Sequence, residues 1–189
     1  MKLSLIPRMA GLILSLAVAF SSLPAHADQR AKQILSNIDQ ATWFSEGHSQ
    51  HIMYVFFDPN CPYCHRLFEE LRPFVKENKL QVRWIPVGIL TASSLGKAAA
   101  ILQAKHPIQA LYQSEADWNF GNTPGGGIEP IKNPSPSIVE KLRKNAALLE
   151  SVGIRGIPVA VFKGDDGNDY LFVGAPSADK LAAIINHIQ

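Results

Sequence analysis

The amino-acid sequence predicts an α/β domain built on one mixed sheet, with helices on both faces of the sheet. The first observation is that short apolar runs typical of buried strands alternate with longer runs of helical periodicity. The second is their order: strand, helix, strand, helical block, strand, strand, helix. A helical crossover joins parallel strands, whereas a tight turn joins antiparallel ones, so the sheet must be mixed.

The first 27 residues read as a secretory signal peptide. Lys2 and Arg8 give a positive start, and residues 9–20 form an apolar run too short to span a bilayer comfortably. The run Ala25-His26-Ala27 is a small-x-small cleavage pattern. We therefore expect cleavage before Asp28 and a periplasmic mature protein. A retained membrane anchor is the alternative, and the short apolar run argues against it.

The mature chain is expected to be one domain of balanced charge. The full sequence has 18 basic and 16 acidic residues. The predicted signal peptide contains two of the basic residues, Lys2 and Arg8, and no acidic one, so it accounts for the whole difference. Nucleic-acid binding requires a concentrated basic surface, which this sequence does not show. About 160 residues remain after the leader, enough for one proper core and too few for two.

The elements of the first half follow from local pattern. A short amphipathic helix and linker occupy residues 28–50, then come a buried strand, a helix that carries both cysteines at its start, and a second strand. The expected ranges are 28–44 for the first helix, 46–50 for a polar turn, 52–57 for the first strand, from about 62 for the second helix, and 82–87 for the second strand.

The second half begins with a helical block and ends with a hairpin and a helix. Residues 94–117 have helical spacing interrupted at Pro107, and the Gly- and Pro-rich stretch 121–136 must be a loop. A capping box, Ser137 to Glu140, predicts a helix that ends near Gly153. The remaining expected ranges are 159–162 and 170–173 for a hairpin across 164–168, and a last helix from Ser177 through residue 187.

Cys61 and Cys64 are the two cysteines of the sequence, and they stand where a strand turns into a helix. A disulfide between them closes a very small ring, so it adds little to stability. A zinc site needs about four ligands, and no second CxxC is present. The pair is therefore predicted to be a redox dithiol rather than a staple or a metal clip. No metal and no other cofactor is expected.

The helix start assigns different roles to the two thiols. Cys61 falls at the first turn, where unpaired N–H groups and the helix dipole favour an anion, so it is the expected attacking thiolate. Cys64 lies one turn further on and would resolve the mixed disulfide. Pro62 suits the first helical position, and Tyr63 is expected to shape the exposed rim. His65 is a candidate source of positive potential.

A second informative segment is residues 153–158. Pro158 directly precedes an apolar strand, and its missing N–H fits only a strand end or an edge. Such a proline is a candidate for a cis peptide bond, although cis is the minority form of X-Pro bonds.

These motifs resemble one family. The segment Asp58 to Cys64, followed by Trp84-Ile85-Pro86-Val87-Gly88, is similar to the catalytic domain of the periplasmic disulfide-exchange proteins DsbG and DsbC, and the Pro62-Tyr63 dipeptide is that of DsbG. The resemblance runs from about Thr42 to the C-terminus.

The resemblance implies a thioredoxin fold in residues 51–189, with a helical insertion at about 93–152 and a cis Ile157-Pro158 bond beside the cysteines. It implies exported client proteins with cysteines, and a membrane or periplasmic redox partner that resets the dithiol. Cys61 and Cys64 would be catalytic. Pro62, Tyr63, Ile157 and Pro158 would form the client site, in which the Ile157 backbone pairs with an extended client segment.

Three departures qualify the resemblance. Residues 28–50 are expected to be a remnant of the linker helix, too short for the family's dimerisation domain, so we expect a monomer and a weak isomerase. Ile157 stands where the family usually has threonine, and Val55 stands where thioredoxin has a buried aspartate. Two other functions stay open: a metal or maturation-pathway carrier that uses the thiols as a handle, and a client-binding chaperone.

Overall fold

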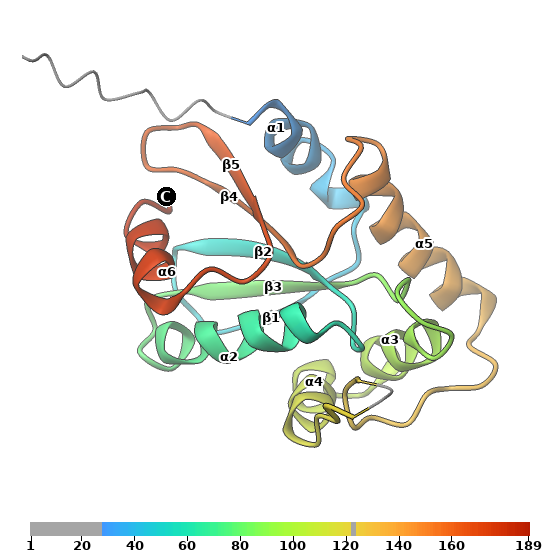
Figure 1. Ribbon diagram of the computed structural model, residues 1–189. Helices are drawn as coiled ribbons and strands as arrows, with labels where there is room; N and C mark the ends of the chain where they lie inside the picture. The colour runs from blue at the N-terminus through green and yellow to red at the C-terminus, as the bar shows by residue number, and fades with distance from the viewer. Residues whose placement is uncertain (1–27, 122–123) are drawn as a thin grey trace, which may run out of the picture.

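A five-stranded mixed sheet with the strand order β1-β3-β2-β4-β5 forms the centre of the protein (Figure 1). The structure is a computed structural model that describes residues 28–121 and 124–189; the predicted signal peptide lies outside them. β2 and β3 are parallel, and the other pairs are antiparallel. The strands are β1 Phe44–Glu46, β2 Ile52–Phe57, β3 Gln81–Pro86, β4 Val159–Lys163 and β5 Asp169–Val173. The predicted mixed sheet is confirmed.

Helices cover both faces of this sheet, as predicted (Figure 1). Because side chains alternate along a strand, Val55 and Phe57 of β2 face one layer while Phe56 faces the other. Helices α2 (Pro62–Lys76) and α6 (Ala178–Ile185) pack on the first face, and α1 (Gln29–Leu35) and α5 (Pro136–Glu150) pack on the second. None of the helices in the described ranges is long and apolar enough to cross a membrane.

Between β3 and β4 the chain forms the predicted helical block at one end of the sheet (Figure 1). The block breaks before Pro107, as the sequence predicts, into α3 (Ser94–Gln103) and α4 (Pro107–Ala116). Proline at the first helical position of α4 needs no N–H partner, which explains why a new helix begins there. A loop then runs to α5.

The expectation of one helix over residues 28–44 is wrong. α1 ends at Leu35, a short 3-10 helix covers Ile38–Gln40, and Phe44–Glu46 forms the edge strand β1. β1 pairs with β3 in the register Phe44 opposite Trp84. The segment is a strand and not a helix because Glu46 is buried at the edge of the sheet by distant partners, which the local sequence pattern does not reveal.

The capping box at Ser137 is also wrong. The N-cap of α5 is Ser135, its side chain makes no capping hydrogen bond, and Pro136 occupies the first helical position. The fixed φ of proline pre-organises the first turn, so the helix starts two residues earlier than the Ser-x-x-Glu pattern indicates. The other end agrees with the prediction: α5 stops at Glu150, and Gly153 takes a φ of 72°.

A buried ion pair links β1 to α2. The Arg72 guanidinium contacts both carboxylate oxygens of Glu46, and Trp84 Nε1 donates to Glu46 Oε2 over 2.9 Å. The Tyr112 hydroxyl from α4 also bonds the Glu46 carboxylate. Glu46 is only 7% exposed. Burial alone would raise the pKa of Glu46, but hydrogen bonding and the charge of Arg72 hold it below its usual value.

Candidate active site

Cys61 and Cys64 lie at the amino-terminal end of α2, directly after the loop that leaves β2. Cys61 is the N-cap residue, Pro62 follows at the first helical position, and Cys64 is in the first turn, as the sequence predicts. The backbone N–H groups of Cys64 and His65 donate to the Cys61 carbonyl. Both cysteines are free thiols and almost fully buried. The strand end and the helix start together fix the two sulfurs beside each other.

The two thiols differ in their acidity. A hydrogen bond from the Cys64 side chain lowers the pKa of Cys61, and the N–H groups of Cys64 and Tyr63 add to this against the effect of burial. Burial raises the pKa of Cys64 well above its usual value, and the hydrogen bond and charge of Cys61 raise it further. Cys61 therefore loses its proton more readily, and Cys64 stays a thiol to higher pH.

The Ile157-Pro158 segment meets the cysteines from β4. Its peptide bond is cis, which confirms the prediction, and the Cys61 thiol donates to the Ile157 carbonyl over 3.6 Å. Pro158 is buried and Ile157 is half-buried.

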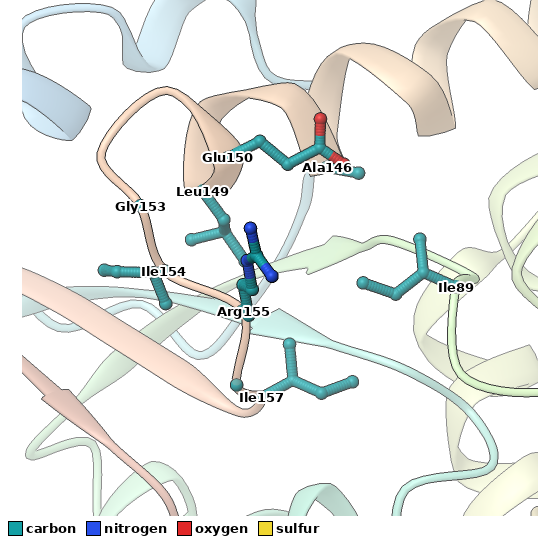
Figure 2. A pocket seen from close by; sticks show the side chains of 9 residues that line it. Ile89, Ala146, Leu149, Glu150, Gly153, Ile154, Arg155 and Ile157 are labelled. Carbon is teal, nitrogen blue, oxygen red and sulfur yellow. The ribbon is translucent and has the colours of Figure 1, made fainter.

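A cavity of about 460 Å³ opens beside Ile157. Figure 2 shows Ile157, Ile89 and Leu149 around it, with the Arg155 side chain between them. The Cys61 sulfur thus adjoins the carbonyl of half-buried Ile157, and Ile157 also lines the cavity together with apolar side chains and the charged residues Glu150 and Arg155.

Asp58 closes the other side of the site. Its carboxylate is fully buried and accepts four hydrogen bonds, two at each oxygen. Oδ2 receives the N–H groups of Ile89 and Leu90, and Oδ1 receives the Asn60 N–H and the Ser94 hydroxyl. In the sequence, Asp58 stands out only as part of the motif that ends at Cys64. An acidic residue at the end of a buried strand was the available signal.

His65 follows Cys64 and is tied to the helical block. His65 Nδ1 lies 2.7 Å from Glu115 Oε2, and its ring stacks on Trp118 with 4.5 Å between centroids. Glu115 is buried, and this raises its pKa against the opposing effect of His65. His65 is thus engaged with a carboxylate of α4 rather than being an isolated positive group. No local signal could pair residues so far apart in the sequence.

Of the other residues predicted for the site, Tyr63 is 63% exposed. Val55, which stands where thioredoxin has a buried aspartate, is fully buried in the apolar core. Cys61, Cys64, Ile157 and Pro158 come together, and Pro62 is exposed on the helix end beside them. Within residues 28–121 and 124–189, no three His, Cys, Asp or Glu side chains are grouped so as to hold a metal ion.

Gly126 packs against the segment that precedes Cys61. Its N–H donates to the Pro59 carbonyl over 2.8 Å. A Cβ at this position would lie 2.1 Å from Ser114 Oγ and 2.8 Å from the Ser114 carbonyl oxygen. Gly126→Ala must therefore push the loop off α4, and we expect it to lower the free energy of unfolding by about 1–3 kcal/mol. Urea denaturation measures this.

Gly121→Ala is the matched control for that change. Its Cβ would meet only the end of the exposed Asn119 side chain, at 3.0 Å. Equal stability of the two variants would contradict the close packing of Gly126.

The lowered pKa of Cys61 predicts the pH dependence of its alkylation. Because the thiolate is the reactive form, the iodoacetamide rate of the reduced protein should rise with pH through a midpoint below 9.0, the ordinary value of a thiol. Cys64, whose pKa is raised well above its usual value, should remain unmodified over this range. Cys64→Ala removes the hydrogen-bond donor, so the midpoint should move up. A midpoint at or above 9.0 in the unmodified protein would refute the assignment.

Comparison with known proteins agrees with this geometry. The sequence matches the thioredoxin-like domain family over residues 38–189. The thiol:disulfide interchange protein DsbG of Pseudomonas aeruginosa is 32% identical over 82% of this chain and 59% of its own length. DsbG of Escherichia coli is 28% identical over 82% of this chain and 62% of its own length. The chain thus spans about three fifths of these relatives.

A solved structure shares the fold. A linker-deletion mutant of Proteus mirabilis ScsC superposes with a TM-score of 0.66 at 20% identity, over 83% of this chain and 81% of that one. The family match covers most of the chain, including the cysteine pair, the sheet and the cis-proline strand. The chain therefore belongs to the thioredoxin-like domain family.

Proposed function

We propose that this protein is a thiol-disulfide oxidoreductase that exchanges disulfide bonds with exported, cysteine-containing client proteins. One observation carries the proposal: a thiol of lowered pKa at the start of α2 adjoins a buried thiol of raised pKa and the carbonyl of half-buried Ile157. The similarity to DsbG supports it, and so does the signal-peptide pattern of residues 1–27, which supports a periplasmic location.

The reaction proceeds in two exchanges. The Cys61 thiolate attacks one sulfur of a client disulfide; a Cys61–client S–S bond forms, and the other client sulfur leaves as a thiolate that takes up a proton. The Cys64 thiol then gives up its proton and attacks the Cys61 sulfur. This forms the Cys61–Cys64 disulfide and releases the second client thiol. The client gains two electrons and the protein loses them; the reverse sequence oxidises a dithiol client.

Client binding is proposed at the Ile157 segment. An extended client backbone that pairs with Ile157 places its cysteine beside Cys61 without reading the client sequence. The cavity beside Ile157 can accommodate a neighbouring client side chain (Figure 2). Tyr63, exposed in the first turn of α2, would supply a further contact for the client. A redox partner in the periplasm or the membrane would return the pair to its working state.

Turnover of a defined disulfide tests this proposal. The purified mature protein should accelerate the reduction of insulin by dithiothreitol, and Cys61→Ser should abolish the acceleration. Tight stoichiometric metal binding without turnover would favour a carrier instead. A Cys61→Ser variant that still prevents client aggregation as well as the unmodified protein would favour a chaperone.

We further propose that the mature protein is a monomer and a weak isomerase. The apolar residues of α1 and of the 3-10 helix that follows it pack within the domain: Ala31 and Ile34 are fully buried, and Leu35 and Ile38 pack on the same cluster. Light scattering over a concentration series should give the monomer mass. A stable dimer at micromolar protein, with efficient refolding of scrambled ribonuclease, would overturn this part.

A further inference from the structure

The Asp58 carboxylate is the buried charge next to the dithiol that the exchange mechanism does not use. Oδ2 accepts from the N–H groups of Ile89 and Leu90 over 2.6 and 2.9 Å, and Oδ1 accepts from the Ser94 hydroxyl over 2.7 Å. The Asn60 N–H, 2.9 Å away, completes the set. All four partners are donors, an arrangement that suits a carboxylate, which only accepts. Asp58 therefore fixes the loop after β3 against the segment that leads into Cys61.

Asp58 also contacts the sulfur of the resolving cysteine. Its backbone N–H donates to Cys64 Sγ over 3.5 Å. The carboxylate is thus held on the residue that hydrogen-bonds Cys64, and it cannot turn away, because four donors fix both of its oxygens. A fixed negative charge in a water-poor site opposes a second negative charge near it. The hydrogen bond from Cys64 dominates the lowered pKa of Cys61, and burial dominates the raised pKa of Cys64; the charge of Asp58 acts beside these larger causes and pushes the pKa of both thiols upward.

We propose that Asp58 is a positioning residue that sets the balance between the dithiol and disulfide forms of the Cys61–Cys64 pair, a role that rests on the proposed exchange function. The dithiol form gains stability when a thiolate is favoured, and a dithiol so stabilised makes its disulfide a stronger oxidant. By opposing the thiolate, Asp58 shifts the pair toward the disulfide and makes the dithiol a better reductant. Asp58 thereby offsets a part of the effect that the hydrogen bonds at the helix start have on Cys61.

Other charged groups approach from the neighbouring elements. Lys97 of α3 bonds Asn60 Oδ1 over 3.0 Å, and the pair of His65 on α2 with Glu115 on α4 lies beyond Cys64. Replacing Asp58 or Ser94 leaves the charges of these groups in place, although Ser94→Ala also removes the hydrogen bond from Asn60 Nδ2 to Ser94 Oγ, 3.2 Å long. Differences between the variants therefore report on the carboxylate and its hydrogen bonds.

Two substitutions separate the charge from the loop contacts. Asp58→Asn removes the charge. Its amide N–H₂ group then faces at least one backbone N–H, and two donors cannot hydrogen-bond to each other. Ser94→Ala keeps the charge and removes one donor, so less of the negative potential is neutralised. If the charge acts, the two variants shift the Cys61 midpoint and the equilibrium between dithiol and disulfide in opposite directions. If Asp58 only holds the loop, both variants loosen the loop. They then shift the midpoint and the equilibrium in the same direction or leave them unchanged.

The test is a thiolate titration followed at 240 nm, together with equilibration against glutathione. In that equilibrium two glutathione thiols form one glutathione disulfide while the protein S–S bond becomes two thiols. Asp58→Asn should lower the Cys61 midpoint and move the equilibrium roughly threefold to tenfold toward the reduced protein, the size of one like-charge contact removed from a buried site. Ser94→Ala should raise the midpoint.

An unchanged or raised midpoint in Asp58→Asn would overturn the proposal, as would an equal lowering in Ser94→Ala. If Asp58→Asn does not fold, Ser94→Ala decides alone: a raised midpoint supports the charge effect, and an unchanged or lowered one refutes it. The titration needs no client. Loss of client turnover with the expected titrations would therefore refute the proposed function and leave the role of Asp58 standing.

Discussion

Replacing Cys64 by serine is expected to stop disulfide turnover while leaving the first attack intact. Cys61 keeps its place at the helix start and its backbone N–H contacts, so it still forms a mixed disulfide. No second thiol is then available to release the client. Turnover of insulin should fall by roughly a thousandfold or more, the scale seen when a reacting group is removed. Stable covalent complexes should accumulate instead.

Non-reducing gel electrophoresis with mass spectrometry measures those complexes and identifies the bonded cysteine. Cys61→Ser is the matched control. Its remaining thiol, Cys64, is buried and has a pKa well above the usual value, so few complexes should form. Complexes that form through Cys64 in preference to Cys61 would reverse the assignment of attacking and resolving thiols.

Replacing Arg72 by methionine should cause the largest loss of stability. It leaves the Glu46 carboxylate buried among Trp84 and Tyr112 without its cation. Removing one partner of a buried ion pair costs about 3–5 kcal/mol, and the partial exposure of Arg72 favours the lower end. Thermal unfolding should shift down by roughly 6–12 °C.

The pH dependence identifies the cause of that loss. The pKa of Glu46 is lowered in the folded protein, so its contribution is present above its ordinary value of 4.5 and is lost as the pH falls through the lowered value. Without Arg72, burial raises that pKa instead, so the variant binds a proton on folding. The gap in stability between the two proteins should therefore begin to narrow above pH 4.5, where the variant takes up its proton, and should narrow further below pH 4.5, where the unmodified protein loses the contribution of Glu46.

Arg143→Met is the control for this substitution. Arg143 pairs with Glu140 on the exposed face of α5, where an ion pair contributes about 0–1 kcal/mol. If Arg72→Met and Arg143→Met unfold at the same temperature, the Glu46 pair does not stabilise the fold as proposed here.

The sequence predicts those parts of this structure that depend on short-range pattern. The dithiol at a strand-to-helix junction follows from an apolar run, two cysteines and Pro62, all within one stretch of chain. The break of the helical block at Pro107 and the hairpin of β4 and β5 are equally local. Each depends on backbone preferences that a few neighbouring residues determine.

The parts that were missed depend on distant partners. β1 is three residues long, and it is a strand because Phe44 and Glu46 pair with β3, not because of its own pattern. The hydrogen bond of Asp58 to Ser94 and the pairing of His65 with Glu115 cross from the core into the helical block. No periodicity connects such residues, since only the folded chain brings them together.

The position of the helical block has a consequence for the order of folding. β2 pairs with β3, which follows it closely, and also with β4, which comes about one hundred residues later, in the register Val55 opposite Ala160. Non-local pairings of this kind form slowly, because the intervening chain loses entropy before any contact compensates for it. The Ile157 carbonyl reaches Cys61 only through β4. Until β4 has joined the sheet, an incompletely folded chain therefore holds the two thiols without the cover of the Ile157 segment.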